Sequence, residues 1–253
     1  MKLPTLAGTI KRRILLNYRA DPDVVERLLP KPFTAQIHRG FAIVGVCLIR
    51  LEQERPAGFP EALGFSSENA AHRMAVQWPG PGGETSTGVY IPRRDTDSVA
   101  NRLAGGRLFP AESHAARFAV CDRDGRIEFS MRSTDREVQV SVTGTESDRF
   151  PQGSVFESLE EASRFFESGC VGYSPCSGYS DFDGIELWTP SWKVNSLEIS
   201  EVHSSYFADE SLFPAGSIAF DHALIMRDIQ HEWRTVSRLS GGANSAKSSS
   251  PGA

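Results

Sequence analysis

Long apolar segments are missing from this sequence of 253 residues. No run approaches the ~18 consecutive apolar residues that a membrane-spanning helix requires. The N-terminus has no apolar core of the kind found in signal peptides, and Pro4 interrupts it early. These absences predict a cytoplasmic protein that has no membrane partner.

Cysteine is scarce, and its spacing does not suit a metal site. The sequence has four cysteines, of which Cys170 and Cys176 are separated by loop-forming residues, with no second close pair. The six histidines also lack the spacing of a metal-binding motif. We therefore expect no metal and reduced thiols. Cys47 and Cys121 lie in strand-like runs, where we expect them to be buried.

Motifs for nucleotide binding and for serine catalysis are absent as well. Residues 79–88 are rich in glycine but lack the Gly-Lys-Ser/Thr ending of a phosphate loop, and no dinucleotide fingerprint occurs. Residues 172–176 lack the final glycine of a nucleophile elbow. We expect no cofactor. Acidic and basic residues are interspersed, with a net charge of −5 and no basic block, so we expect no nucleic-acid partner.

Apolar patterning predicts a chain made mainly of β-strands. Residues 40–51 form a nearly continuous apolar run, which is typical of a central strand. Asp124-Gly125 separates two strand-like runs and predicts a hairpin. Further strands are predicted around Val138, Val140 and Val142 and near residues 185–194, 196–207 and 217–228. This pattern suits a large curved antiparallel sheet or barrel-like fold with helices at its rim.

Three short helices are predicted between the strands. Asp21 is a suitable N-cap and Pro22 suits the first helical position. Ser158 and Glu161 have the spacing of a capping box. The predicted helices lie near residues 22–29, 96–104 and 158–168.

No internal repeat or linker divides the sequence. A β-rich fold of this length is commonly one unit, so we expect a single domain in residues 1–240. Residues 241–253 consist mostly of Gly, Ser, Ala and Pro and offer little to pack, so we expect a disordered tail.

Two segments resemble known families. Residues 18–32 contain Tyr-Arg-x-Asp, a short helical stretch and Pro-x-Pro, in the order found near the N-terminus of acetoacetate decarboxylases. Residues 204–233 resemble a family of unknown function, number 2071 or YqjF-like, which is placed in the acetoacetate decarboxylase-like superfamily. The resemblance covers residues 8–235. It implies a mainly β (β-rich α+β) fold, in which a curved antiparallel sheet closes into a cone-like barrel around a ligand cavity, with a few short peripheral helices.

The sequence departs from the decarboxylase at the catalytic nucleophile. In that family a lysine forms a Schiff base, and a second lysine next to it lowers its pKa by like-charge proximity. The matching positions here are Ala111 and Glu112, and no lysine occurs between Lys31 and Lys193. Decarboxylation by the family's mechanism is therefore not expected.

Other positions match the family's site. Glu68 lies a few residues after Gly64, as the decarboxylase's catalytic-site glutamate lies a few residues after a Gly-rich turn, and Lys11, beside Arg12 and Arg13, aligns with the arginine that binds the substrate carboxylate. The resemblance thus makes Glu68 a catalytic candidate and makes Lys11 and Arg12 substrate-binding candidates. A solvated glutamate or a partner of Arg73 is the alternative for Glu68. A solvated charge cluster is the alternative for the basic residues.

Residue chemistry adds further candidates. Glu112 and His114 are two residues apart and would face the same side of a strand, where they can act as acid and base. A polar loop is the alternative. Arg93 and Arg94 can form a guanidinium fork for a substrate carboxylate, or can pair with nearby acids.

The most polar part of the C-terminal motif favours a structural role. These residues are Asp221, His222, Arg227, His231 and Glu232. We expect them to seal the barrel end or to form an oligomer interface. The family resemblance also implies a homo-oligomer.

Two functions remain open. The first is a cofactor-free enzyme that acts on a small carbonyl or carboxylic compound by acid/base chemistry, as a lyase, isomerase or cyclase-like enzyme. Glu68, with Glu112 or His114, would transfer protons, and a nearby Arg or Lys would hold the anion. The second is a non-catalytic small-molecule-binding barrel, because fold alone does not decide function.

Overall fold

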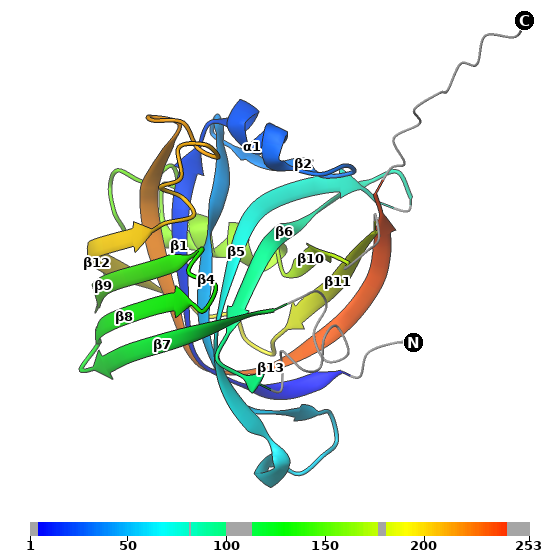
Figure 1. The fold of residues 1–253 in the computed structure, drawn as a ribbon, viewed down its shortest axis with the longest axis vertical. Helices are drawn as coiled ribbons and strands as arrows, with labels where there is room; N and C mark the ends of the chain where they lie inside the picture. Colours follow the sequence, from blue (N-terminus) through cyan, green and yellow to red (C-terminus); the bar gives the residue numbers. More distant parts are fainter. Residues whose placement is uncertain (1–4, 81, 100–112, 177–180, 242–253) are drawn as a thin grey trace, which may run out of the picture.

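The structure is a computed structural model that describes residues 5–80, 82–99, 113–176 and 181–241, most of them in strands (Figure 1). The strands are β1 (Leu6–Ala20), β2 (Thr34–Ala35), β3 (Ile37–His38), β4 (Phe41–Pro56), β5 (Phe65–Pro79), β6 (Thr85–Thr96), β7 (His114–Arg123), β8 (Arg126–Ser133), β9 (Gln139–Ser147), β10 (Val171–Pro175), β11 (Asp181–Trp188), β12 (Asn195–Ser204) and β13 (Ile218–Ser240). The helices are α1 (Pro22–Leu28), α3 (Leu159–Ser168) and the 3₁₀ turn η1 (Glu61–Leu63). The prediction of a mainly β fold with short helices is confirmed.

Seven of the strands close into a ring. Strand β13 pairs with both β1 and β11, and β6 pairs with both β5 and β10, so hydrogen bonds run unbroken through β13, β1, β4, β5, β6, β10 and β11. Closure of this kind removes the exposed edges of a sheet. Neighbouring strands of the ring are antiparallel except for β10 and β6, which are parallel. Figure 1 shows β5, β6, β10, β11 and β13 curving around one interior. The predicted curved, cone-like architecture is thus confirmed.

A second group of strands extends the sheet from β6 back to β13. Its order is β7, β8, β9 and β12, and β7 joins β6 in parallel. The predicted hairpin is present between β7 and β8. Asp124 and Gly125 at its turn have φ values of 51° and 76°, as a type I′ turn requires.

Strands β1, β4 and β5 form a wall that is buried on both faces. On β1, Leu16 packs into one apolar cluster and its neighbour Leu15 into another, and on β4 Val46 and Cys47 divide in the same way. A strand that is buried on both faces has a continuous apolar sequence instead of an alternating one. This explains the apolar run that predicted β4.

The two helices that the structure describes begin at their predicted caps. The Asp21 carboxylate accepts the Asp23 N–H at 2.8 Å, and Ser158 Oγ accepts the Glu161 N–H at 3.2 Å. In a capping box the Glu161 carboxylate would accept the N–H of the N-cap residue Ser158. Here it accepts the N–H of the preceding residue, Glu157, at 2.6 Å. The predicted helix at 96–104 lies largely outside the described residues, and β6 runs to its first position, Thr96.

Several expectations need correction. The strand predicted at residues 185–194 begins at Asp181 and ends at Trp188, just before Pro190, which cannot donate to a strand ladder. Cys121 is exposed because it lies on the outer face of β7. Asp221, His222 and His231 are buried inside the chain, and their expected role at a barrel end or an interface stays a prediction.

No helix in the described part of the chain is long and apolar enough to cross a membrane. The tail that was predicted to be disordered begins at residue 241, and residues 242–253 lie outside the described residues.

Candidate functional site

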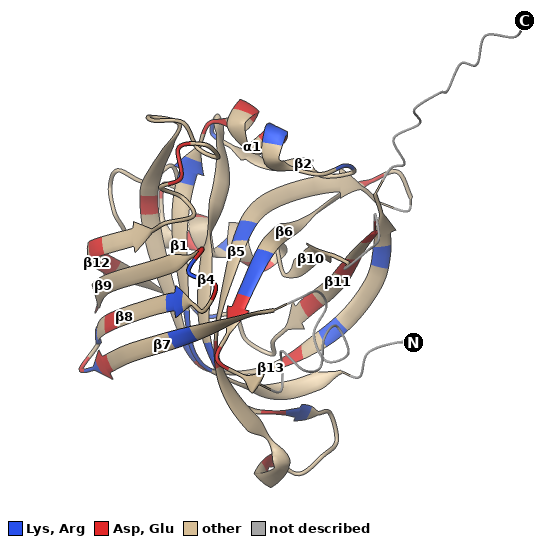
Figure 2. Cartoon of the chain, in the orientation of Figure 1, with Lys and Arg blue, Asp and Glu red and all other residues tan. Residues whose placement is uncertain are grey.

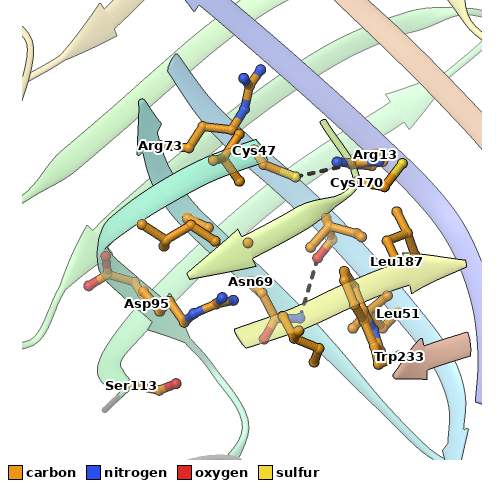
Figure 3. A pocket seen from close by; sticks show the side chains of 18 of the residues that line it. Arg13, Cys47, Leu51, Asn69, Arg73, Asp95, Ser113, Cys170, Leu187 and Trp233 are labelled. Atoms are coloured by element: carbon orange, nitrogen blue, oxygen red, sulfur yellow. Dashed lines mark hydrogen bonds between the residues drawn. The ribbon is translucent and has the colours of Figure 1, made fainter. Parts of the chain in front are cut away.

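A cavity of about 100 Å³ lies inside the seven-strand ring, and each of the seven strands contributes to its lining (Figure 3). Most of the lining is apolar and includes Ile49, Leu51, Val89, Ile91, Ile185, Leu187 and Trp233. A volume of this size holds several water molecules or one small organic molecule. A mostly apolar pocket with a few convergent polar groups is the usual form of a small-molecule site.

Three of the polar residues in the lining are arginines. They are Arg13 on β1, Arg73 on β5 and Arg94 on β6. Figure 2 shows basic positions midway along β5 and β6, which lie side by side.

Each of these arginines donates to a neutral acceptor. Arg13 Nε donates to Cys47 Sγ at 3.3 Å, Arg94 Nε donates to Ser174 Oγ at 3.2 Å, and Arg73 donates to the side-chain oxygen of Asn17. The positive charge of the three groups is therefore not neutralised by a paired carboxylate.

Burial changes the pKa of two of these arginines without removing their charge. It lowers the pKa of Arg73 and of Arg94 to about 10, so both stay protonated near neutral pH. Arg73 Nε and Arg94 Nη2 are also buried without a hydrogen-bond partner among the described residues. A buried donor that lacks an acceptor is costly, and a ligand with anionic oxygens would supply the acceptors.

One carboxylate, Asp95, also lines the cavity. Burial raises its pKa, and Arg93 opposes this by donating to both carboxylate oxygens at 3.0–3.2 Å. Arg93 also bridges Asp135 at 2.8 Å and Glu137 at 2.6 Å. Since Arg93 neutralises Asp95, the cavity keeps a net positive charge.

Two thiols lie in the same cavity. Figure 3 shows Cys47 joined to Arg13 by a hydrogen bond, with Cys170 beside the guanidinium. Burial raises the pKa of the Cys170 thiol. Because Cys47 lines the cavity and contacts Arg13, its thiol can report on the cavity by chemical labelling.

Glu68 and Arg12 lie together, but outside this cavity. Two hydrogen bonds of 2.8 and 2.9 Å join the Arg12 guanidinium to the Glu68 carboxylate. Burial raises the pKa of Glu68, and Arg12 opposes the shift. Both line a shallow depression with Lys11 and with Asp122 on β7. Consecutive residues of a strand face opposite sides, so Arg12 and Arg13 belong to different faces of the shared wall.

Of the remaining predicted residues, Arg93 and His114 both contact Asp135. Arg94 lines the cavity, whereas Arg93 is engaged with the three acids described above. His114 Nδ1 lies 3.2 Å from Asp135 at the start of β7. Glu112 lies outside the described residues, next in sequence to the cavity residue Ser113.

The described lysines do not reach the cavity. Lys11, Lys31 and Lys193 are all exposed, and none of them lines it. Among the described residues, no group of three His, Cys, Asp or Glu side chains is arranged to hold a metal.

Arg13, Arg73 and Asp95 are charged cavity residues that the sequence did not mark as part of a site. The signal for Arg73 is its position inside the apolar strand β5, where a charged side chain needs a specific partner. For Arg13 the signal is the adjacent pair Arg12-Arg13, because alternation places one guanidinium on each face of β1.

The ring of strands has the acetoacetate decarboxylase-like fold, and the comparisons agree on this fold. The sequence matches the DUF2071 family, described as an uncharacterized conserved protein, over residues 8–224. The chain therefore belongs to this family. A search of curated proteins found no match.

Solved structures share the fold at low identity. An acetoacetate decarboxylase-like enzyme from Sphingomonas wittichii RW1 aligns with a TM-score of 0.58 and 13% identity, over 96% of this chain and 95% of that one. Acetoacetate decarboxylase from Legionella pneumophila aligns with 0.54 and 12%, over 94% and 89%. The enduracididine biosynthesis enzyme MppR, in complex with pyruvate, aligns with 0.55 and 11%, over 96% and 91%.

Proposed function

We propose that the chain is an enzyme that acts on a small carbonyl-containing carboxylate held in the ring cavity. The observation that carries this proposal is that three arginines, the buried Arg73 and the half-buried Arg13 and Arg94, line a mostly apolar cavity and donate to neutral partners. In such surroundings a carboxylate gains strong charge-assisted hydrogen bonds. The fold relative MppR, whose complex contains pyruvate, supports a substrate of this size.

The chemistry that suits the cavity is proton transfer without a cofactor. Asp95 is a carboxylate in the lining, and burial raises its pKa toward the range useful for acid/base catalysis. A substrate carboxylate bound by arginines would present its carbonyl and adjacent carbon to the rest of the lining. We therefore assign proton transfer at the carbon next to the carbonyl to Asp95, as in a lyase, isomerase or cyclase-like reaction. Glu68 and His114 do not line this cavity, although His114 pairs with Asp95 across β6 and β7, and a role for Glu112 stays a prediction.

Pyruvate tests binding and chemistry together. Calorimetry should show that pyruvate binds and that pyruvamide, its neutral analogue, binds much more weakly. Arg94→Gln should weaken pyruvate binding by about tenfold or more, since a charge-assisted hydrogen bond is lost. Arg117→Gln, at an exposed arginine of β7 outside the cavity, is the matched control and should change nothing. Equal binding of pyruvate and pyruvamide would refute an anion site.

Proton exchange separates the enzyme from its alternative. In D₂O the methyl protons of pyruvate should exchange faster with the protein than without it, and Asp95→Asn should abolish the gain. The second candidate, a non-catalytic binding barrel, is favoured by one observation, namely that Arg93 already neutralises Asp95. Binding of pyruvate without exchange would select that candidate.

A further inference from the structure

A row of side chains leads from the cavity across four neighbouring strands. His222 on β13 pairs with Asn17 on β1, Asn17 pairs with Gly45 on β4, and Gly45 pairs with Arg73 on β5. These four positions therefore lie side by side across the sheet. All three side chains of the row are almost fully buried, with 0% exposure for Asn17 and His222 and 4% for Arg73.

Gly45 allows Arg73 to reach across β4. A Cβ atom at this position would lie 3.3 Å from the side-chain oxygen of Asn17 and would collide with the carbonyl oxygen of Leu16. With no side chain in between, the Arg73 guanidinium donates directly to Asn17 Oδ1. It also stacks at 4.8 Å over the ring of Phe166, which belongs to α3.

The hydrogen bonds of the row have a defined direction. His222 Nδ1 lies 2.6 Å from the Asp221 carboxylate, which only accepts, so the proton is on Nδ1. Nε2 is then an acceptor, and it lies 3.0 Å from Asn17 Nδ2, which donates to it. The amide of Asn17 therefore presents its oxygen to Arg73.

A β-bulge brings Asp221 to the end of the row. The pairing of β1 with β13 passes from Asn17–His222 to Tyr18–Phe220, which leaves Asp221 as the extra residue. A bulge re-aims side chains, and here two consecutive residues are both buried and in contact.

The Asp221 carboxylate is fully engaged. It accepts from Ser154 Oγ at 2.6 Å, from the Val155 N–H at 3.0 Å and from Arg19 at 3.2 Å. Burial raises its pKa, but hydrogen bonds from His222 and Ser154 outweigh this and hold the pKa below its usual range. Asp221 therefore stays ionised.

We propose that Asp221, His222 and Asn17 are positioning residues that hold the Arg73 guanidinium beside the cavity that its side chain lines, and leave its charge available to an anionic ligand. The inference rests on the proposed function, because it assigns Arg73 to a bound carboxylate. Two neutral side chains separate Arg73 from the only carboxylate in the row. A carboxylate in direct contact with Arg73 would hold it equally well but would neutralise it.

The arrangement requires a neutral His222. The described groups that face its ring are Asp221 on β13, Asn17 on β1, Arg73 on β5, Ser154, and the rings of Phe150, Phe156 and Phe166. Protonation would place two donors face to face, His222 Nε2–H and Asn17 Nδ2–H. The Asn17 amide would then have to rotate and present its donors to Arg73.

Cys47 provides an assay in the same cavity. Its thiolate attacks the methylene carbon of iodoacetate or iodoacetamide, a C–S bond forms, and iodide leaves. Iodoacetate carries a carboxylate where iodoacetamide carries a neutral amide. The rate of Cys47 labelling by iodoacetate, divided by the rate with iodoacetamide, therefore reports how strongly the cavity attracts an anion. Exposed Cys121 gives the reference ratio in the same molecule, and peptide mass spectrometry measures both sites.

We expect the iodoacetate-to-iodoacetamide ratio at Cys47 to exceed the ratio at Cys121. Asn17→Asp places a carboxylate beside Arg73 and should lower the Cys47 ratio about tenfold, the equivalent of one hydrogen bond to a charged group. Asn195→Asp makes the same substitution at an exposed position of β12 and should leave the ratio unchanged.

A conservative variant separates positioning from folding. In His222→Gln the amide can donate to Asp221 and accept from Asn17, so the preference for iodoacetate should persist. The pH dependence is measured as the iodoacetate-to-iodoacetamide ratio at Cys47 divided by the same ratio at Cys121. In the wild type this quotient should fall in acid as His222 takes up a proton. In His222→Gln it should not fall.

The outcomes distinguish the two proposals. A wild-type ratio at Cys47 no higher than at Cys121, or no labelling of Cys47 by either reagent, would overturn the proposed function and this inference together. A high wild-type ratio that Asn17→Asp leaves unchanged would overturn this inference alone.

Discussion

Arginine, and not lysine, supplies the positive charge of the cavity. A buried ammonium loses its proton readily, whereas a guanidinium keeps its own, and the pKa of Arg73 and Arg94 remains about 10 despite burial. A guanidinium binds carboxylates in a planar, two-pronged geometry but does not form an imine. At the residue scale the site is therefore suited to holding an anion and not to attacking its carbonyl group.

The absence of a cavity lysine among the described residues predicts that no imine forms. Incubation with acetoacetate or pyruvate and borohydride should leave the intact mass unchanged, and acetoacetate should not be decarboxylated. Lys11 is exposed, and the hydrogen bond from it to Asp228 raises its pKa, so it is protonated and unreactive near neutral pH. A stoichiometric adduct that maps to any lysine would contradict this expectation.

His72 makes stability depend on pH. Its ring is fully buried, and burial, with a smaller effect of Arg93, lowers its pKa to about 3. The unfolded chain binds a proton at His72 near pH 6.5 and the folded chain does not, so stability falls as pH drops below that value. At pH 5 the loss is about 2 kcal/mol.

Replacing His72 should remove much of this slope. Neither ring nitrogen has a hydrogen-bond partner in the part of the chain that the structure describes, so His72→Leu removes an unsatisfied polar group. Urea unfolding at pH 7.5 and pH 5 should show a smaller pH difference for His72→Leu than for the wild type. Exposed His203→Leu is the control and should keep the wild-type slope. An unchanged slope in His72→Leu would show that the pKa of His72 does not differ between the folded and unfolded states.

At the scale of elements, α3 depends on its N-cap. Ser158 Oγ satisfies the Glu161 N–H, and the helix buries Ala162 and Phe166 against the ring. Ser158→Ala should lower the free energy of unfolding by about 1 kcal/mol. Ser130→Ala, at an exposed position of β8, should change it little. Calorimetric unfolding measures both, and equal stability of the two variants would show that the cap does not hold the helix.

The sequence predicts where strands and helices lie better than it predicts which side of a strand each residue faces. The β4 run, the Asp124-Gly125 hairpin and the Ser158 cap follow from local patterns, and all three are present. Because β1 and β5 are buried on both sides, their patterns do not show which of two adjacent residues faces the cavity. Arg12 and Glu68 lie on one side of the wall, and Arg13 and its ring neighbours lie on the other.

Features of the whole molecule depend on contacts between distant segments. The ring closes where β11 pairs with β13. The bulge at Asp221 is a shift of register between β1, near the start of the chain, and β13, near its end. No local pattern encodes either. The homo-oligomer, the cytoplasmic location and the single domain of residues 1–240 stay predictions.

The wall of β1, β4 and β5 is shared by two interiors, so residues on one of its faces can be changed independently of residues on the other. Alternate residues of the wall belong to different chambers, so a library that varies only Arg13, Cys47 and Asn69 would reshape the cavity. The residues in between, such as Leu16 and Val46, pack into the other apolar cluster and would be left intact. The shape of the cavity can thus be altered at odd positions of the three strands while the apolar cluster on the other face is left intact.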